Sequence, residues 1–290
     1  MALGSAASFG FNITFSRIAA LSGVPGPTLV TWRVLAMMAL GIAVGLVLRA
    51  DFRIPRGERG PMVVLGLATA GCGLCYLSSV AFIPVTVAAV LFYTFPVLIV
   101  LASPFVEGGR IGGGLMAIAL LAFCGVVLVV GPAFGDLDPI GLLLAAGASL
   151  SAVAQFFAAV RCPRTGTAAK VVWLQLMVLP VAALSALATG GLGGPGTLLL
   201  APWSVAFNVF GFVLGFVLQL MALSRVTAVA GGLAFCAEPV VASLTSAAVL
   251  GETLMPVQYM GGAMVIAAIV ANVLRDRRRS RLALTPEPAA

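Results

Sequence analysis

Residues 226–250 read VTAVAGGLAFCAEPVVASLTSAAVL, an apolar run that contains one charged side chain, Glu238. About 20 residues of this kind, at roughly 1.5 Å of rise per residue, cross the ~30 Å hydrocarbon core of a bilayer as an α-helix. The whole chain of 290 residues is 61% hydrophobic and only 9% charged. This balance is too apolar for a water-soluble protein, so we expect a membrane protein.

The same apolar pattern recurs along the chain. Leu, Ala, Val and Gly dominate these stretches, and the alternation typical of a transmembrane barrel is missing, so helices with internally paired backbone groups are expected. The fold class predicted is an all-α polytopic membrane protein with ten transmembrane helices. The ten spans lie near residues 2–22, 28–48, 61–82, 84–106, 112–131, 139–160, 168–189, 203–224, 230–250 and 256–274.

The formal net charge of +7 raises the question of a nucleic-acid partner. Lys and Arg occur between spans 2 and 3, 4 and 5, 6 and 7, and 8 and 9, and again after span 10, whereas the intervening loops contain none. This one-sided distribution is the positive-inside pattern, which predicts cytoplasmic N- and C-termini in a bacterial inner membrane. The positive charge is therefore explained without a nucleic-acid partner. The basic tail, residues 275–290, is expected to anchor the topology near lipid head groups and to be disordered at its end.

The two halves of the chain resemble each other. The matches are Gly4 with Gly147, Ser8 with Ser151, Asn12 with Gln155, Phe92 with Phe235 and Pro96 with Pro239 at a separation of 143 residues, and Trp32 with Trp173 and Ser78 with Gln219 at 141. Glu107 and Glu252 fit the same scheme with a two-residue slip. We therefore predict two five-helix repeats, residues 1–131 and 139–274. Because five is odd, the second repeat enters the membrane from the opposite side, which gives an inverted topology around a central cavity.

Polar side chains in several spans recur at helical spacing and share a helix face. The residues expected to line the cavity and to offer hydrogen bonds are Ser8, Asn12, Ser78, Gln155 and Gln219. The alternative is that such groups only hydrogen-bond neighbouring helices together. The amides of Asn12 and Gln155 are hard to satisfy in lipid and occupy matching positions, which favours a wet cavity at the repeat interface.

Glu238 lies near the centre of the bilayer, where an ionised side chain costs about 3 kcal/mol on insertion scales. It must border water, hold a proton or have a partner. It is predicted to attract a substrate ammonium or to carry a coupling proton, and a structural hydrogen bond across a bent helix pair is the alternative. Pro239 and Pro96 remove backbone donors at matching positions, so they are the expected flex points and mark a binding site between the halves.

Arg33 is a second intramembrane charge, near the start of span 2. It is predicted to contact a substrate carboxylate or to form an outer gate, against the alternative that it snorkels or forms a structural ion pair. Phe92 and Phe235, each one turn before a matching proline, are expected to form apolar walls of the cavity.

No cofactor or metal is predicted. The chain has no His, and its five Cys are scattered, so neither a disulfide framework nor a metal site is expected. Cys72 and Cys75 form a single C-x-x-C pair, which we interpret as core thiols.

The sequence resembles the drug/metabolite transporter superfamily in its ten-helix EamA-type form. The resemblance is carried by WRVLAMMAL from Trp32, by VTVAAVLFYTFPVLIVL with Glu107 shortly after it, and by AEPVVASLTSAAVLGETL followed by YMGGAMVIAAIVANVL. It covers nearly the whole chain, and the overall layout is similar to bacterial amino-acid exporters of the YddG type. It implies an outward-moving carrier whose cavity is lined by helices 1–4 and 6–9. Span 4 departs from the pattern because it reaches Glu107 two residues early and lacks the Leu-Gly before it.

The predicted function is export of small neutral or aromatic amino acids, or related zwitterionic metabolites, by alternating access. A carrier for drugs or other metabolites is the alternative within the same class. A non-transporting membrane scaffold and an intramembrane lipid-modifying enzyme are the alternatives of other classes. The enzyme is disfavoured because the chain has a single deep carboxylate and no His. The oligomeric state stays open, and a monomer is compatible with the sequence.

Overall fold

A computed structural model describes residues 1–108, 112–131, 137–188 and 193–284, and all its regular secondary structure is helical. The long helices are α1 (Ala2–Leu21), α2 (Gly26–Val47), α3 (Arg59–Ser79), α6 (Gly113–Val130), α7 (Pro139–Val160), α8 (Thr167–Ala188), α9 (Pro202–Leu223) and α12 (Pro256–Leu284). The shorter ones are α4 (Val85–Phe92), α5 (Phe95–Glu107), α10 (Ala228–Phe235) and α11 (Ala237–Leu250), with the 3₁₀ turns η1 (Arg56–Glu58) and η2 (Pro195–Leu200).

The all-helical polytopic fold predicted from the sequence is confirmed. Nine helical segments among the described residues are long and apolar enough to cross a membrane. The first predicted span, α1, is not among these nine; it is 20 residues long but contains Asn12, Arg17 and several serines, which make it less apolar. The tail is expected to begin at residue 275, but α12 continues through this point to Leu284. The last residues of the tail, 285–290, lie outside the described part of the chain.

The fourth and ninth predicted spans are both broken in the middle. Tyr93 and Thr94 separate α4 from α5, and Cys236 separates α10 from α11. Pro96 and Pro239 lie just after the two breaks. Each proline lacks the N–H that would bond to the carbonyl four residues earlier, so the helical hydrogen bonding is interrupted there. The prolines expected to be flex points therefore lie one helical turn after Phe92 and Phe235, the residues that end the first half-helices.

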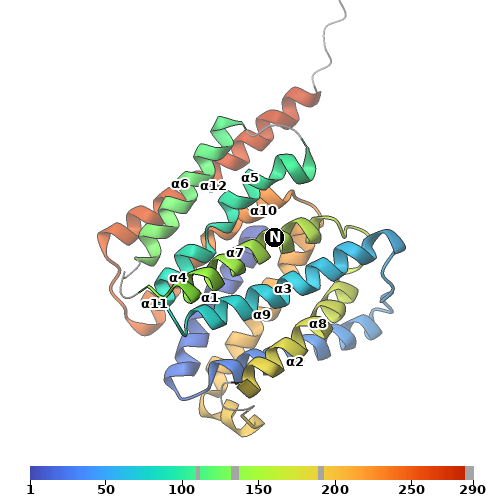
Figure 1. The fold of residues 1–290 in the computed structure, drawn as a ribbon, viewed down its shortest axis with the longest axis vertical. Helices are drawn as coiled ribbons and strands as arrows, with labels where there is room; N and C mark the ends of the chain where they lie inside the picture. Colours follow the sequence, from blue (N-terminus) through green and yellow to red (C-terminus); the bar gives the residue numbers. More distant parts are fainter. Residues whose placement is uncertain (109–111, 132–136, 189–192, 285–290) are drawn as a thin grey trace, which may run out of the picture.

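The helices pack in pairs (Figure 1). α3 lies along α7, α1 along α9, α2 along α8, and α6 along α12, which forms one side of the molecule. If α1 corresponds to α7 and α3 to α9, the first two pairings are related to each other. The inverted repeat itself stays a prediction, and so do the boundaries of the two units.

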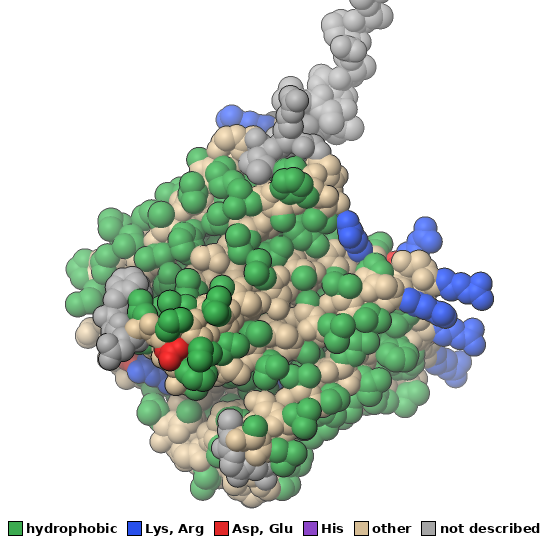
Figure 2. Space-filling model, in the orientation of Figure 1, with side chains coloured by type: hydrophobic (Ala, Val, Ile, Leu, Met, Phe, Trp, Pro, Cys, Tyr) green, Lys and Arg blue, Asp and Glu red, His purple; other side chains and the backbone are tan. Residues whose placement is uncertain are grey.

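The outer surface matches a bilayer environment. Large apolar side chains are exposed along many helices, among them Val47, Leu67, Leu143 and Phe210. Figure 2 shows hydrophobic side chains across the broad face, with most visible Lys and Arg side chains gathered at one edge. In Figure 1 this edge is where α2 leads into α3; the connection holds three arginines, and a fourth begins α3.

The α6–α12 pair depends on two glycines that face each other. An ideal Cβ at Gly125 would lie 2.7 Å from the Gly261 carbonyl oxygen, and one at Gly261 would lie 2.6 Å from the Gly125 oxygen. The two backbones are therefore in direct contact, and any side chain at either position would force the helices apart.

Gly125→Ala is expected to destabilise the protein by about 1–3 kcal/mol, because overpacking at a tight contact forces backbone shifts. Thermal unfolding in detergent would measure this as a lowered Tm. Gly114→Ala is the matched control, since an ideal Cβ at this other α6 glycine meets nothing within 4 Å. An equal Tm for the two variants would contradict the prediction.

Candidate functional site

The candidate site lies where the two broken spans meet α1. Helix α5 packs against α10, and α1 packs against both α10 and α11. An ideal Cβ at Gly10 would lie 2.6 Å from the Glu238 carbonyl oxygen, so the absence of a side chain on α1 allows the start of α11 to approach closely. This contact positions Glu238 in the first turn of α11, where free N–H groups favour a carboxylate.

Tyrosine and cysteine side chains surround the Glu238 carboxylate. The Tyr93 hydroxyl lies within hydrogen-bonding reach of it, and Tyr76, Cys72 and Cys236 are near enough to interact with its charge. Glu238, Tyr76 and Cys72 keep partial exposure. Glu238 takes part in no ion pair recorded among the described residues, so its neighbours are neutral and it has no cationic partner there.

A continuous series of aromatic rings leads away from Glu238 and crosses between the halves. Its successive centroid distances are 5.4 Å for Tyr76–Phe92, 5.3 Å for Phe92–Phe95, 5.2 Å for Phe95–Phe156, 5.2 Å for Phe156–Phe235, 6.0 Å for Phe235–Phe9 and 6.3 Å for Phe9–Phe212. Phe92 and Phe235, selected from the sequence, are both members. We call these seven side chains the aromatic series.

Arg33 lies at the other end of the aromatic series. Its guanidinium carbon sits 4.3 Å from the centroid of the Phe212 ring, a cation–π arrangement. Nη1 donates to the Asn12 Oδ1 over 3.4 Å, and Nε is buried without a hydrogen-bond partner. No carboxylate of the described residues pairs with this cation. The guanidinium thus faces the interior and does not snorkel towards the surface.

The predicted cavity amides connect helices. Asn12 Nδ2 donates to the Asn208 carbonyl over 2.7 Å, and Asn208 Nδ2 donates to the Asn12 carbonyl over 3.1 Å, which joins α1 to α9. Gln155 Nε2 donates to the Thr69 hydroxyl over 2.9 Å and joins α7 to α3. The interhelical hydrogen bonding that was the alternative for these residues is therefore present, and their contact with a substrate stays a prediction.

The other predicted cavity residues have varied surroundings. Ser8 donates to the Gly4 carbonyl of its own helix. Gln219 is 5% exposed, and Ser78 is partly exposed near the end of α3. None of the three contacts Glu238 through a hydrogen bond that the structure records, and their role in binding also stays a prediction.

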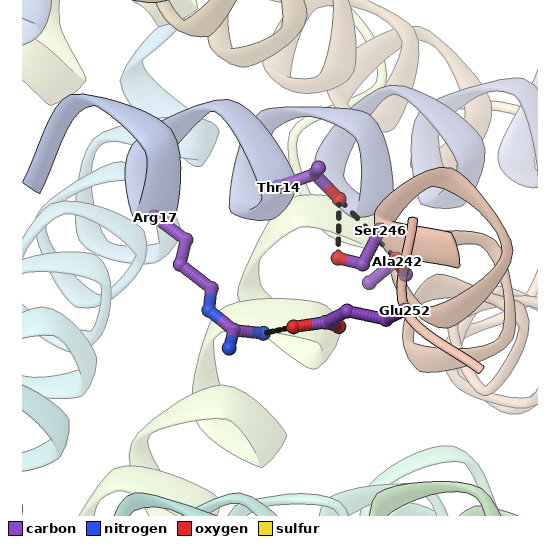
Figure 3. Close-up of polar contacts among 5 residues, drawn as sticks. All are labelled: Thr14, Arg17, Ala242, Ser246 and Glu252. Atoms are coloured by element: carbon purple, nitrogen blue, oxygen red, sulfur yellow. Dashed lines mark hydrogen bonds and ion pairs between the residues drawn. The ribbon is translucent and has the colours of Figure 1, made fainter. Parts of the chain in front are cut away.

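The end of α1 closes the site towards one membrane face (Figure 3). The Thr14 hydroxyl donates to the Ala242 carbonyl and lies 3.1 Å from the Ser246 hydroxyl, so α1 is bonded to α11. One turn further, Arg17 Nη1 lies 2.7 Å from Glu252 Oε1. The cytoplasmic termini predicted from the charge distribution would make this the outer face. The sequence could not predict this pair, because Arg17 and Glu252 are far apart in the chain.

A second polar cluster, at the opposite face, was also missed. The buried Glu58 carboxylate accepts hydrogen bonds from the backbone N–H groups of Arg164 and Thr165 and from the Thr165 hydroxyl. It ties the α2–α3 connection to the α7–α8 connection. A single acid in a basic loop is common and does not by itself indicate a buried site. The one sequence signal that could have suggested a partner for Glu58 is the threonine-containing turn after Cys162.

Comparisons with known proteins agree on one group. A model of the EamA-like transporter family matches residues 1–131 and 139–274. The chain is 25% identical to the threonine/homoserine exporter RhtA of Escherichia coli strain K12 over 277 residues, which cover 90% of this chain and 86% of that exporter. It is 26% identical to the exporter of the same name from Salmonella typhimurium strain LT2 over 269 residues, with the same coverage. A crystal structure of a further protein is similar in fold, with a TM-score of 0.78, 23% identity, and coverage of 95% of this chain and 98% of its own.

Glu58→Ala is expected to destabilise the protein by roughly 1–3 kcal/mol, because it leaves buried donors of the α7–α8 connection without an acceptor. Glu58→Gln keeps one acceptor oxygen and should lose less. Asp51→Ala is the matched control, since this acid lies in the same connection but is exposed. Thermal unfolding would rank the variants, and an equal loss for Asp51→Ala and Glu58→Ala would refute the assignment.

Proposed function

Because the chain belongs to the EamA-like transporter family, we propose that it is a carrier that exports small neutral or aromatic amino acids, or related zwitterionic metabolites. The relatives named as threonine/homoserine exporters support amino-acid export at a coarse level, given their 25–26% identity. We further propose that it resides in the bacterial inner membrane with cytoplasmic termini, on the basis of its one-sided arginines. Like these exporters, it would act by transport without catalysing a reaction.

The observation that carries this proposal is a pair of opposite charges without counter-ions inside the membrane region. Glu238 is surrounded by tyrosines and cysteines, and Arg33 by an amide and an aromatic ring. Isolated charges at this depth are costly and mark transport pathways. A zwitterion carries the two missing charges, an ammonium for Glu238 and a carboxylate for Arg33. Arg33 would then act as the carboxylate contact, the first of the two roles predicted for it.

The aromatic series, which begins at Tyr76 near Glu238 and ends at Phe212 beside Arg33, would offer an apolar surface for the substrate side chain. Phe92, Phe235 and their neighbours would favour aliphatic or aromatic groups by area burial. Hydrogen bonds to the substrate would come from the polar side chains of the predicted cavity when the neighbouring helices move apart. These side chains are Asn12, Gln155, Gln219, Ser8 and Ser78.

Alternating access would use the two broken helices. The half-helices α4 and α5, and α10 and α11, meet at breaks next to Pro96 and Pro239, and few backbone hydrogen bonds have to be broken for bending there. The contacts of α1 with α11 support closure of the face that we assign as outer. We therefore assign this structure to a state that is closed towards the outside, the state in which an exporter would load from the cytoplasm.

Counterflow in proteoliposomes across a broad amino-acid panel would test the function itself. We expect radiolabelled substrate to accumulate against an internal pool of the same amino acid, at rates well above those of empty liposomes. A panel in which no amino acid exceeds the empty liposomes would end the amino-acid proposal. Efflux of drugs or other metabolites by the same vesicles would then favour the alternative substrate class.

Arg33→Gln should weaken carboxylate recognition specifically. Loss of a charge-assisted hydrogen bond of about 1.5–3 kcal/mol corresponds to roughly a 10- to 150-fold weaker interaction. We expect this loss for binding of threonine and little change for threoninol, the amino alcohol that lacks the carboxylate. Arg33→Lys, which keeps the charge, should retain part of the affinity. An equal loss for both ligands would assign Arg33 to a structural role.

Glu238→Gln should reduce amino-acid counterflow at least tenfold, since the ammonium would lose its only anionic contact in the candidate site. Tyr93→Phe is the control, because it removes the neighbouring hydroxyl and leaves the carboxylate in place. If Glu238→Gln transported at the wild-type rate, the carboxylate would have only the structural role that was the alternative.

A further inference from the structure

The outer closure consists of the contacts that Gly10, Thr14 and Arg17 of α1 make with α11 and the loop after it. Gly10 touches the backbone of Glu238, Thr14 bonds to α11 one turn further out, and Arg17 pairs with Glu252 at the end. The Arg17 and Glu252 side chains are 56% and 38% exposed, so this ion pair lies where water has access to it. The closure thus runs from the candidate site to the membrane surface.

The predicted repeat places a second arginine and a second glutamate at the corresponding helix ends. The separation of 143 residues that matches Ser8 with Ser151 makes α7 the counterpart of α1. At the same separation Arg17 corresponds to Val160, which is next to Arg161. The counterpart of α11 is α5, and Glu107 at its end corresponds to Glu252 with the two-residue slip. Because the repeat is inverted, Arg161 and Glu107 belong to the opposite, cytoplasmic face.

The structure brings these two residues to the same place. Arg161 caps the end of α7, and Glu107 is the last residue of α5. Arg161 Nη2 donates to the carbonyl oxygen of Val106, the neighbour of Glu107, over 3.0 Å. The guanidinium thus reaches the end of α5, yet its contact there is with the backbone, and no ion pair between Arg161 and Glu107 is recorded.

The two crossings also differ deeper in the membrane. Gly10 and Thr14 of α1 correspond to Val153 and Phe157 of α7. A valine cannot allow the backbone contact that Gly10 makes, and a phenylalanine has no hydroxyl for the bond that Thr14 makes. The inner crossing of α7 and α5 therefore lacks the two contacts that tighten the outer one, and its closure relies more on groups at the surface.

We propose that Arg161 and Glu107 form the cytoplasmic counterpart of the Arg17–Glu252 pair, and that the two ion pairs are made in alternate states of the carrier. In the state described here the outer pair is formed and the inner pair is not. When α7 and α5 close the cytoplasmic face, the Arg161 guanidinium moves from the Val106 carbonyl to the Glu107 carboxylate, and the outer pair separates. This inference rests on the alternating access proposed above.

Each pair is expected to bias the equilibrium without locking it. Exposed ion pairs are individually weak because water and salt screen them. Two states that differ little in free energy nevertheless change several-fold in relative population when one such contact is lost. The Arg161–Glu107 pair offsets the weaker packing at the inner crossing, so its loss should enlarge the population that is closed outside and open inside.

Charge reversal with rescue tests the inner pair. Arg161→Glu and Glu107→Arg should each lower the outward-open population several-fold, and the double variant Arg161→Glu/Glu107→Arg should restore it. Distances between spin labels would report the populations of the two states. One label pair, at Leu21 and Met255, reports on the outer face, and another, at Phe105 and Pro163, reports on the inner face. The labels are introduced in a transport-competent variant without native cysteines. The same cycle on Arg17 and Glu252 should shift the distances in the opposite sense. Arg56→Glu, an exposed arginine of the cytoplasmic face, is the control and should leave them unchanged.

The outcomes separate this inference from the proposed function. Rescue by the double variant supports the inner pair even if the substrate turns out not to be an amino acid. Additive losses without rescue overturn it, because they assign Arg161 to the Val106 carbonyl alone, and so does the absence of any shift. Wild-type counterflow in the same vesicles shows whether amino-acid transport stands independently.

Discussion

The absence of water in the hydrocarbon core is the constraint on which this structure depends. A backbone or side-chain polar group at that depth needs a partner, and helices provide one for the backbone. Serine and threonine follow the same rule with their hydroxyl groups, since Ser8, Thr31 and Thr69 each bond to a carbonyl four residues back in their own helix. The amides Asn12 and Gln155 satisfy it by joining neighbouring helices. Against this background, a charged group left without a counter-ion carries information about function.

Glu238 and Arg33 are such exceptions, and the fold places both on one aromatic series. Each has neutral neighbours that tolerate its charge without neutralising it: Tyr93 beside the acid, and Asn12 with Phe212 around the base. A fully paired Glu–Arg bridge would stabilise the empty carrier and would leave nothing for a zwitterion to neutralise. For the proposed zwitterionic substrate, keeping the charges apart would make the bound state, with its ligand ions, the better compensated one.

The sequence predicted the helical membrane fold because each span is a local property of about 20 residues. It also located the breaks in the fourth and ninth spans, since proline removes a backbone donor wherever it occurs. It did not predict which side chains meet. The Thr14–Ser246 contact, the Arg17–Glu252 pair and the Glu58–Thr165 bond all join residues more than 100 positions apart. Periodicity identifies the face on which a residue lies, and the partner depends on how whole helices pack. The hydrogen-bond partners of the amides Asn12 and Gln155, on α9 and α3, are likewise visible only in the packed structure.

The backbone contact between Gly125 and Gly261 also bears on how the protein is made. Helices leave the ribosome in order, so α6 enters the bilayer long before α12. Until Pro256–Leu284 has emerged, the glycine face of α6 has only lipid against it. Docking of α6 therefore has to wait for α12, and a chain interrupted before α12 would contain every candidate substrate contact while lacking this joint.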